Sequence, residues 1–167
     1  MSVFNGFVFH EHFTRYSISE SIILTLHNEN FGFGIDENRE DAETRKHCSL
    51  YMKELQGFLS RVCAEYLRDF VCQDFLSLCK APLAVKCIGY FITQASLVRP
   101  LGEGGQMLLA SDCAQLELAL EPLVGRVDPG LLGAAYTKLR AFRSVLFMKP
   151  EEVENCNELA SGALPYR

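Results

Sequence analysis

Apolar positions along the chain recur at helical rather than strand spacing. The clearest run steps by four, three, four, three and four residues through Leu109, Cys113, Leu116, Leu120, Leu123 and Val127. Such a seam is typical of a helix that packs along one face, and it predicts a helix over about 105–127. The same periodicity predicts helices over about 17–29, 48–72, 82–98 and 130–147.

Local signals place the ends of these helices. Ser17 with Glu20 three positions later forms a capping box, which is typical of a helix start. Pro82 is expected in the first turn of the third helix, because the missing N–H of proline has no helical partner there. Pro100 favours an end to that helix, since the residue before a proline avoids the α region. Pro122 lies inside the fourth helix and predicts a kink or an early end there.

The stretches between and beyond the helices are polar or irregular. Residues 30–46 contain two glycines and five acidic side chains, which predicts a solvated acidic linker, with an acidic docking motif as the alternative. Residues 1–16 form a Phe-rich irregular segment, and residues 149–167 form a polar tail. No segment sustains a two-residue alternation, so strands are not expected outside residues 3–9. We therefore expect one all-α domain over 17–148, an antiparallel helical bundle of four to five helices.

Composition agrees with a globular chain and excludes several classes of protein. The chain has 167 residues, of which 49% are apolar and 22% are charged, and this excludes a disordered or collagen-like chain. Its formal charge of −5 argues against a nucleic-acid binder, which is usually basic. No run of about 18 apolar residues is present, so no membrane-spanning segment is expected. The first ten residues lack the basic region and the cleavage site of a signal peptide.

Cysteine, histidine and glycine patterns predict no catalytic, cofactor or metal site. The seven cysteines contain no C-x-x-C pair and, without an export signal, are expected to be small buried hydrophobes or surface thiols. His10 and His12 lie two positions apart, which on a helix points them to different faces. The stretch 102–105 lacks the frame of a phosphate-binding loop, and Glu103 would repel a phosphate, so a turn is expected there. No nucleophile elbow occurs, and a thiol enzyme is the third-ranked hypothesis.

The fourth and fifth predicted helices carry surface features that favour a partner. Basic residues concentrate on the fifth helix of an acidic protein, which indicates either a solvated face or contact with an acidic partner or anionic lipid. Both helices also have apolar residues outside their main stripe, so we expect an exposed apolar patch above about 400 Å² around them. The candidate partner-contact residues are Leu118, Val124, Tyr136, Lys138, Arg140, Arg143, Val145 and Phe147.

Four stretches of the chain carry a resemblance to a known family. They are residues 48–58 (CSLYMKELQGF), 95–107 (ASLVRPLGEGGQM), 110–119 (ASDCAQLELA) and 139–147 (LRAFRSVLF). In this order and register they closely resemble the C-terminal part of subunit 5 of the conserved oligomeric Golgi complex, and the resemblance runs from about residue 18 to residue 148. Subunits of that family are several times longer, so the resemblance implies that this chain corresponds to a truncated or alternatively spliced fragment.

The resemblance implies a function as well as a fold. It implies a non-catalytic subunit of a vesicle-tethering complex in intra-Golgi retrograde transport, shaped as part of an extended rod of stacked helical bundles. It also implies a peripheral membrane protein on the cytosolic face of the Golgi, which assembles with the other subunits and above all with subunit 7. No cofactor, metal or nucleic acid is implied. The alternative is a helical adaptor that binds anionic lipid or an acidic partner through the basic fifth helix.

Overall fold

The computed structural model describes residues 18–34, 48–67, 73–124, 129–149 and 152. Residues 18–24 form a helix that continues into a 3₁₀ turn, η1 (Thr25–Asn28). The helix α2 (Leu50–Arg61) continues into a π-helical turn, η2 (Val62–Leu67), and is followed by α3 (Gln73–Ala95), α4 (Glu103–Val124) and α5 (Pro129–Val145). No strand occurs among the described residues, and the predicted all-α fold is confirmed.

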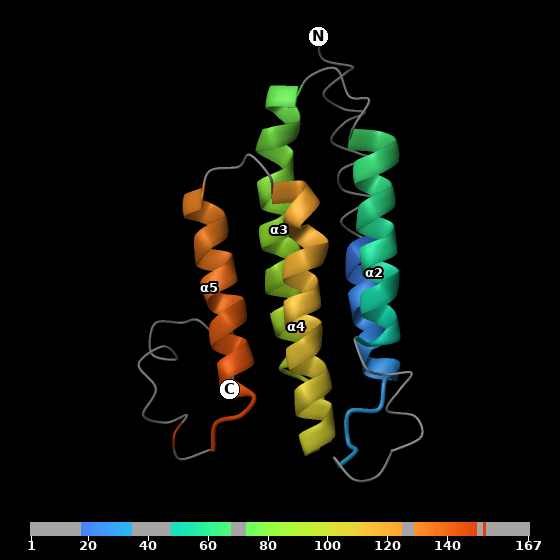
Figure 1. The fold of residues 1–167 in the computed structure, drawn as a ribbon, viewed down its shortest axis with the longest axis vertical. Helices are drawn as coiled ribbons and strands as arrows, with labels where there is room; N and C mark the ends of the chain where they lie inside the picture. Colours follow the sequence, from blue (N-terminus) through green and yellow to red (C-terminus); the bar gives the residue numbers. More distant parts are fainter. Residues whose placement is uncertain (1–17, 35–47, 68–72, 125–128, 150–151, 153–167) are drawn as a thin grey trace.

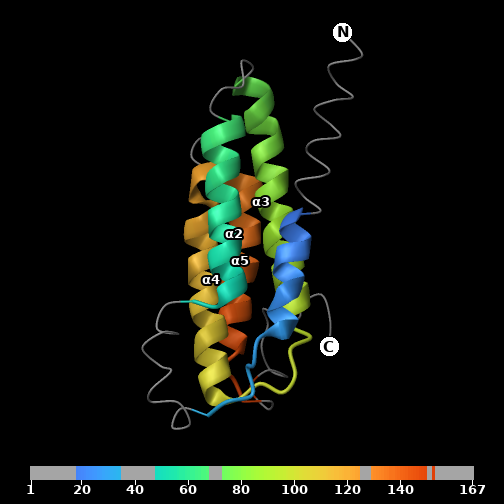
Figure 2. The same ribbon diagram turned by 90° about the vertical axis from the view of Figure 1, so that its right-hand side faces the viewer.

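The helices stand side by side in an antiparallel bundle (Figure 1, Figure 2). Their direction alternates along the chain, so α2 and α4 run one way while α3 and α5 run the other. α3 packs against both α4 and α5, and α2 packs against α4. Figure 1 shows α5 at one edge of the bundle, which leaves part of its surface uncovered by the other described helices.

One continuous apolar core fills the space between the helices. Phe91 of α3 and Phe142 of α5 meet edge to face, with ring centroids 6.5 Å apart. Each large apolar side chain contributes roughly 1.5–3 kcal/mol when it is fully buried, so these contacts drive the packing. Val127, at the end of the predicted α4 seam, lies outside the described residues. The other five positions of that seam are at most 1% exposed: Leu109, Cys113, Leu116, Leu120 and Leu123.

α3 begins earlier than the sequence predicts. The expected helix start at Pro82 is wrong, because α3 spans Gln73–Ala95 and holds this proline in its interior. Leu83 and Ala84, the next two residues, are buried, and the proline itself is exposed. Ala81, which precedes the proline, is buried too, so packing on both sides of Pro82 helps to offset the roughly 3 kcal/mol that an interior proline costs a helix. α4 also contains a proline, as predicted, and extends two positions beyond it to Val124.

The helix predicted over 48–72 changes its geometry part-way along. It is α-helical as far as Arg61 and widens to a π-helical turn in η2. Tyr51, Leu55 and Val62, which belong to its predicted apolar stripe, are buried. The stripe is therefore on the core side as far as Val62, where η2 begins; the side chains of residues 66 and 67 and the whole of residues 68–72 lie outside the description.

A short segment that we call the strap, residues 29–34, crosses the N-terminus of α4. The N–H of Gly102 donates to the carbonyl of Phe31 at 2.8 Å, and the N–H of Gly104 donates to the carbonyl of Phe33 at 3.1 Å. A Cβ atom on Gly105 would overlap the Phe31 carbonyl oxygen. The glycines at 102–105 therefore allow the backbones of the strap and of α4 to lie close together. The turn predicted over 102–105 is wrong in part, because α4 already begins at residue 103.

The strap also corrects the prediction for residues 30–46. Phe31 is only 2% exposed and belongs to the core, so the expectation of a solvated linker is wrong at this residue. A single large apolar side chain can be buried from an otherwise polar stretch when its backbone bonds are supplied by another element. Residues 35–46 of the predicted linker, the segment 1–16 and residues 153–167 of the predicted tail lie outside the described part of the chain.

Candidate partner-binding surface

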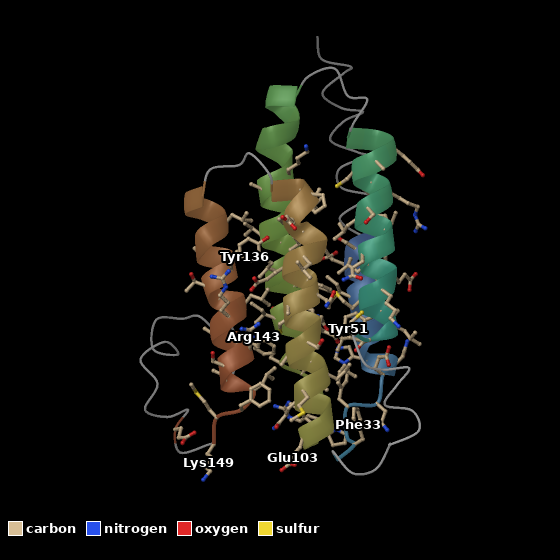
Figure 3. All side chains as sticks on the ribbon, viewed as in Figure 1. Phe33, Tyr51, Glu103, Tyr136, Arg143 and Lys149 are labelled. Atoms are coloured by element: carbon tan, nitrogen blue, oxygen red, sulfur yellow. The ribbon has the colours of Figure 1, made fainter. Side chains whose placement is uncertain are left out.

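Four of the candidate partner-contact residues form one row along α5. Tyr136, Arg140, Arg143 and Phe147 are spaced by four, three and four positions, which places them on one face of a helix. The helical backbone bonding continues just past the end of α5, because the N–H of Phe147 donates to the Ser144 carbonyl at 3.3 Å. Figure 3 shows Tyr136 and Arg143 on the side of α5 that borders α4. We call these four residues the α5 row.

An ion pair joins the α5 row to α4. The Arg140 guanidinium donates to the Glu117 carboxylate in a fork, with 3.3 Å between Nε and Oε1 and 3.4 Å between Nη2 and Oε2. The two side chains are 65% and 27% exposed, so solvent screens the pair, which contributes at most about 1 kcal/mol. Burial, followed by the Glu117 and Glu121 carboxylates, raises the pKa of Tyr136. The α4–α5 border is therefore acidic beside Tyr136.

The other candidates lie outside this row. Leu118 is 59% exposed on α4, eleven positions from the 55%-exposed Met107, and this separation puts both side chains on one face of the helix. Lys138 and Val145 lie seven positions apart on a different side of α5, with the lysine exposed and the valine half-buried. The side chain of Val124 lies outside the description. The apolar patch expected around α4 and α5 stays a prediction.

A buried acidic residue on α4 was not singled out by the sequence patterns. Asp112 is 0% exposed. Its Oδ1 accepts from the Ser49 N–H at 2.9 Å, and its Oδ2 accepts from Ser49 Oγ at 2.6 Å and from the Tyr51 hydroxyl at 2.7 Å. A signal was present in the sequence, because Asp112 lies three positions after Leu109 and four before Leu116, within the buried seam.

Asp112 holds the start of α2 against α4. Ser49 is the N-cap residue of α2, and a carboxylate near a helix N-terminus is stabilised by the unpaired N–H groups and by the helix dipole. The strap supplies a second carboxylate there, since Glu29 Oε1 accepts from the Leu50 N–H at 2.9 Å. The start of α2 is therefore tied both to α4 and to the strap.

Burial controls the protonation of the groups around Asp112. It raises the pKa of the Asp112 carboxyl, although the hydrogen bonds from Ser49 and Tyr51 oppose this shift. Burial and then the adjacent Asp112 charge raise the pKa of the Tyr51 hydroxyl well above its usual value. The same two causes raise the pKa of the Cys113 thiol to about 12. At neutral pH the tyrosine therefore remains a hydrogen-bond donor and the cysteine remains a thiol.

The described cysteines do not have the properties of nucleophiles. Cys48, Cys87 and Cys113 are buried, Cys63 is half-buried, and all four are free thiols. Burial raises the pKa of each, in the case of Cys87 to about 11. A reactive cysteine needs a lowered pKa, so these four positions do not support the thiol-enzyme hypothesis.

Metal-binding clusters and membrane-spanning helices were also sought in the described part of the chain. No group of three or more His, Cys, Asp or Glu side chains there is arranged to hold a metal ion. Within the same residues, no helix combines the length and apolar character needed to cross a bilayer.

Comparison with known proteins places this helical bundle in a family. The chain is 47% identical over 135 residues to conserved oligomeric Golgi complex subunit 5 of Mus musculus, and 33% identical over 144 residues to the subunit of Arabidopsis thaliana. The corresponding protein of Drosophila melanogaster is 31% identical over 132 residues. These alignments cover 79–80% of this chain and 16% of each relative. No family model matches the chain, and no solved structure matches it.

The fold and the surfaces described above define an all-α bundle with an exposed edge helix. The sequence relationships are more specific: the chain belongs to the family of conserved oligomeric Golgi complex subunit 5, as its resemblance to that family predicts. It spans about a sixth of the length of the curated relatives that it matches.

Proposed function

We propose that the chain is a non-catalytic helical scaffold within a Golgi vesicle-tethering complex, where its protein–protein contacts support intra-Golgi retrograde transport. The family relationship carries this proposal, because relatives named as subunits of the conserved oligomeric Golgi complex match about 80% of the chain. Those names describe components of an assembly and mention no catalytic activity. A bundle of antiparallel helices with a continuous apolar core is suited to hold contact surfaces at fixed positions.

The proposal extends to location and partners. The chain is peripheral to the membrane, lies on the cytosolic face of the Golgi and reaches it through the other subunits of the complex. Subunit 7 is the first partner to test. The contacts involve the candidate residues on α4 and α5, and this is supported by the exposure of Leu118, Arg143 and Phe147 on two adjacent helices.

Affinity purification from cells tests the proposal. The tagged chain is expected to co-purify with the other subunits of the complex, identified by mass spectrometry, with subunit 7 the most enriched. Leu118→Asp combined with Phe147→Asp is expected to reduce this enrichment, because both side chains are more than half exposed. Leu24→Asp, at a 44%-exposed position on the first helix, is the matched control. Failure of the folded, unmodified chain to recover any subunit would refute the proposal.

A helical adaptor for anionic lipid is the second candidate. The exposed cations Lys138, Arg143 and Lys149 favour it, since basic side chains attract anionic headgroups. Flotation with vesicles that contain phosphatidylserine tests this function, and salt-sensitive binding is the expected result.

A further inference from the structure

The side of α4 that faces away from the core carries one row of side chains. Met107 lies two positions before the buried Leu109, which places it about half a turn around the helix from the seam. Leu118 lies on the same outward side, and both side chains are more than half exposed. Two half-buried small residues lie between them at helical spacing. We call these four positions the outer row: Met107, Ser111, Ala114 and Leu118.

The other described helices leave the outer row uncovered. α4 packs against α2, α3 and α5 with its remaining sides. In Figure 1 α4 lies in front of α3 and between α2 and α5, and in Figure 2, turned by 90°, α4 stands at one margin of the bundle. Among the described helices, α4 therefore forms an outward ridge that another molecule can reach directly.

The outer row is complementary to itself when two copies of α4 run antiparallel. Its spacing of four, three and four positions is symmetric about a point between residues 112 and 113. A two-fold axis at that point places Met107 of one copy on Leu118 of the other, and Ser111 on Ala114, and it repeats both contacts. The small residues at the centre allow the helices to approach closely, while large apolar side chains meet at both ends.

We propose that two copies of this chain associate through their outer rows, with α4 packed antiparallel against α4 about a two-fold axis. A contact with a different protein does not require a row that is symmetric about its own centre, whereas a two-fold contact with a second copy does. Burial of Met107 and Leu118, which are 55% and 59% exposed in the single chain, drives the association.

The size of the contact indicates a weak dimer. Only one helix of each copy takes part, so the interface is at the low end of the range for specific protein interfaces. We expect a reversible dimer with a Kd of about 10–100 µM. Leu118 is also a candidate contact with other subunits, so the dimer and such a contact exclude each other at this face. The inference goes beyond the proposed function and does not rest on it.

Charge gives this arrangement a signature. Glu103 and Glu121 are both exposed, and they lie eighteen positions apart, which is five helical turns and puts them on one side of α4. Both are nearly the same distance from the two-fold axis, so the antiparallel contact brings Glu121 of one copy near Glu103 of the other. Glu121→Lys turns both repulsive pairs into attractive ones and is expected to lower the Kd about threefold or more.

A matched variant controls for net charge. Glu65→Lys makes the same charge change at an exposed position of η2 and is expected to leave the Kd within about twofold. Equal effects of Glu65→Lys and Glu121→Lys would show that only the net charge matters, and would overturn the proposed arrangement.

Analytical ultracentrifugation of the purified full chain tests the association itself. Between about 5 and 500 µM the unmodified chain is expected to show a monomer–dimer equilibrium. Leu118→Asp is expected to remain monomeric, whereas Leu24→Asp, at a 44%-exposed position on the first helix, is expected to dimerise like the unmodified chain. A chain that stays monomeric at the highest concentration, or association that persists in Leu118→Asp, would overturn the inference.

Disulfide formation between two variants tests the geometry. An equimolar mixture of Met107→Cys and Leu118→Cys under mild oxidation is expected to give a dimer with a 107–118 link, identified by mass spectrometry. Each variant alone is expected to give no 107–107 or 118–118 link, because equivalent positions lie about 16 Å apart along antiparallel helices. Self-links in equal or higher yield would indicate parallel or unordered contacts and overturn the proposal. The unmodified chain controls for links through the native cysteines.

The outcomes separate this inference from the proposed function. If the chain stays monomeric and still co-purifies with the subunits of the complex, the inference fails and the proposed function stands. If the chain dimerises with the 107–118 link and recovers no subunit from cells, the inference stands and the proposed function fails.

Discussion

Replacement of Asp112 is expected to weaken the bundle more than replacement of any exposed acidic residue. In Asp112→Ala, the Ser49 N–H, the Ser49 hydroxyl and the Tyr51 hydroxyl lose their common acceptor in a fully buried site. Hydrogen bonds to a charged group contribute about 1.5–3 kcal/mol each, and loss of the buried charge offsets part of this. We expect the free energy of unfolding to fall by about 3–5 kcal/mol, a large share of the roughly 5–15 kcal/mol typical of a domain.

Urea unfolding at pH 7, followed by circular dichroism, measures this loss. Glu117→Ala is the matched control, because it removes another acidic side chain of α4 whose ion pair is exposed, and it is expected to cost less than about 1 kcal/mol. A loss below about 1 kcal/mol for Asp112→Ala would refute the argument, since it would mean that the three donors find other acceptors or water.

The pH dependence of stability gives an independent test of the same residue. Burial raises the pKa of Asp112 in the folded state above its usual value of 3.8, so the folded state binds more protons than the unfolded state between these two pKa values. The contribution of Asp112 to the free energy of unfolding therefore falls as pH rises through that window. Asp112→Asn cannot titrate, and it is expected to remove this component from a series of unfolding curves.

Three further predictions concern glycine, proline and cysteine positions, and thermal melting or chemical labelling checks each of them. Gly105→Ala is expected to lower the free energy of unfolding by about 2 kcal/mol or more, because its Cβ would overlap the Phe31 carbonyl. Gly57→Ala is expected to raise the free energy of unfolding by about 0.5–1 kcal/mol, because the space around this position of α2 is open. Pro122→Ala is expected to raise the melting temperature by restoring a helix hydrogen bond, and a lower value would show that α4 needs this proline for its packing. Cys87 and Cys113 are expected to react with iodoacetamide at pH 8 only after unfolding, and rapid labelling of the native chain would contradict their burial and raised pKa values.

Periodicity predicted the helices well where one apolar stripe continues without interruption. The α4 seam from Leu109 to Leu123 is buried along its whole length, because an amphipathic helix has one stable way to face a core. The predicted start of α3 was wrong because of Pro82. Local propensity favours a proline at a helix start, whereas in the structure α3 continues on both sides of it. Helix boundaries depend on the balance between local propensity and tertiary packing, and the local sequence gives only the first of these.

Contacts between distant segments could not be derived from the sequence patterns. The burial of Phe31 depends on three glycines about 70 positions later, and the role of Asp112 depends on Ser49 and Tyr51 about 60 positions earlier. Neither pairing has a local signature. On the candidate surface, the sequence patterns indicated eight contact residues as one set and did not separate the four that share a face of α5, and the pairing of Arg140 required the position of Glu117.

The strap limits how far the chain can be shortened from its N-terminal side without loss of stability. Excision of residues 18–34, whether by proteolysis or by a change in splicing, would leave α4 without the two carbonyls that cap its first turn and α2 without the Glu29 carboxylate at its start. It would also open the site that Phe31 fills in the core. Helices α2 to α5 are therefore expected to be less stable without this segment, and a shortened chain that starts at residue 48 should unfold at a lower urea concentration than the whole chain.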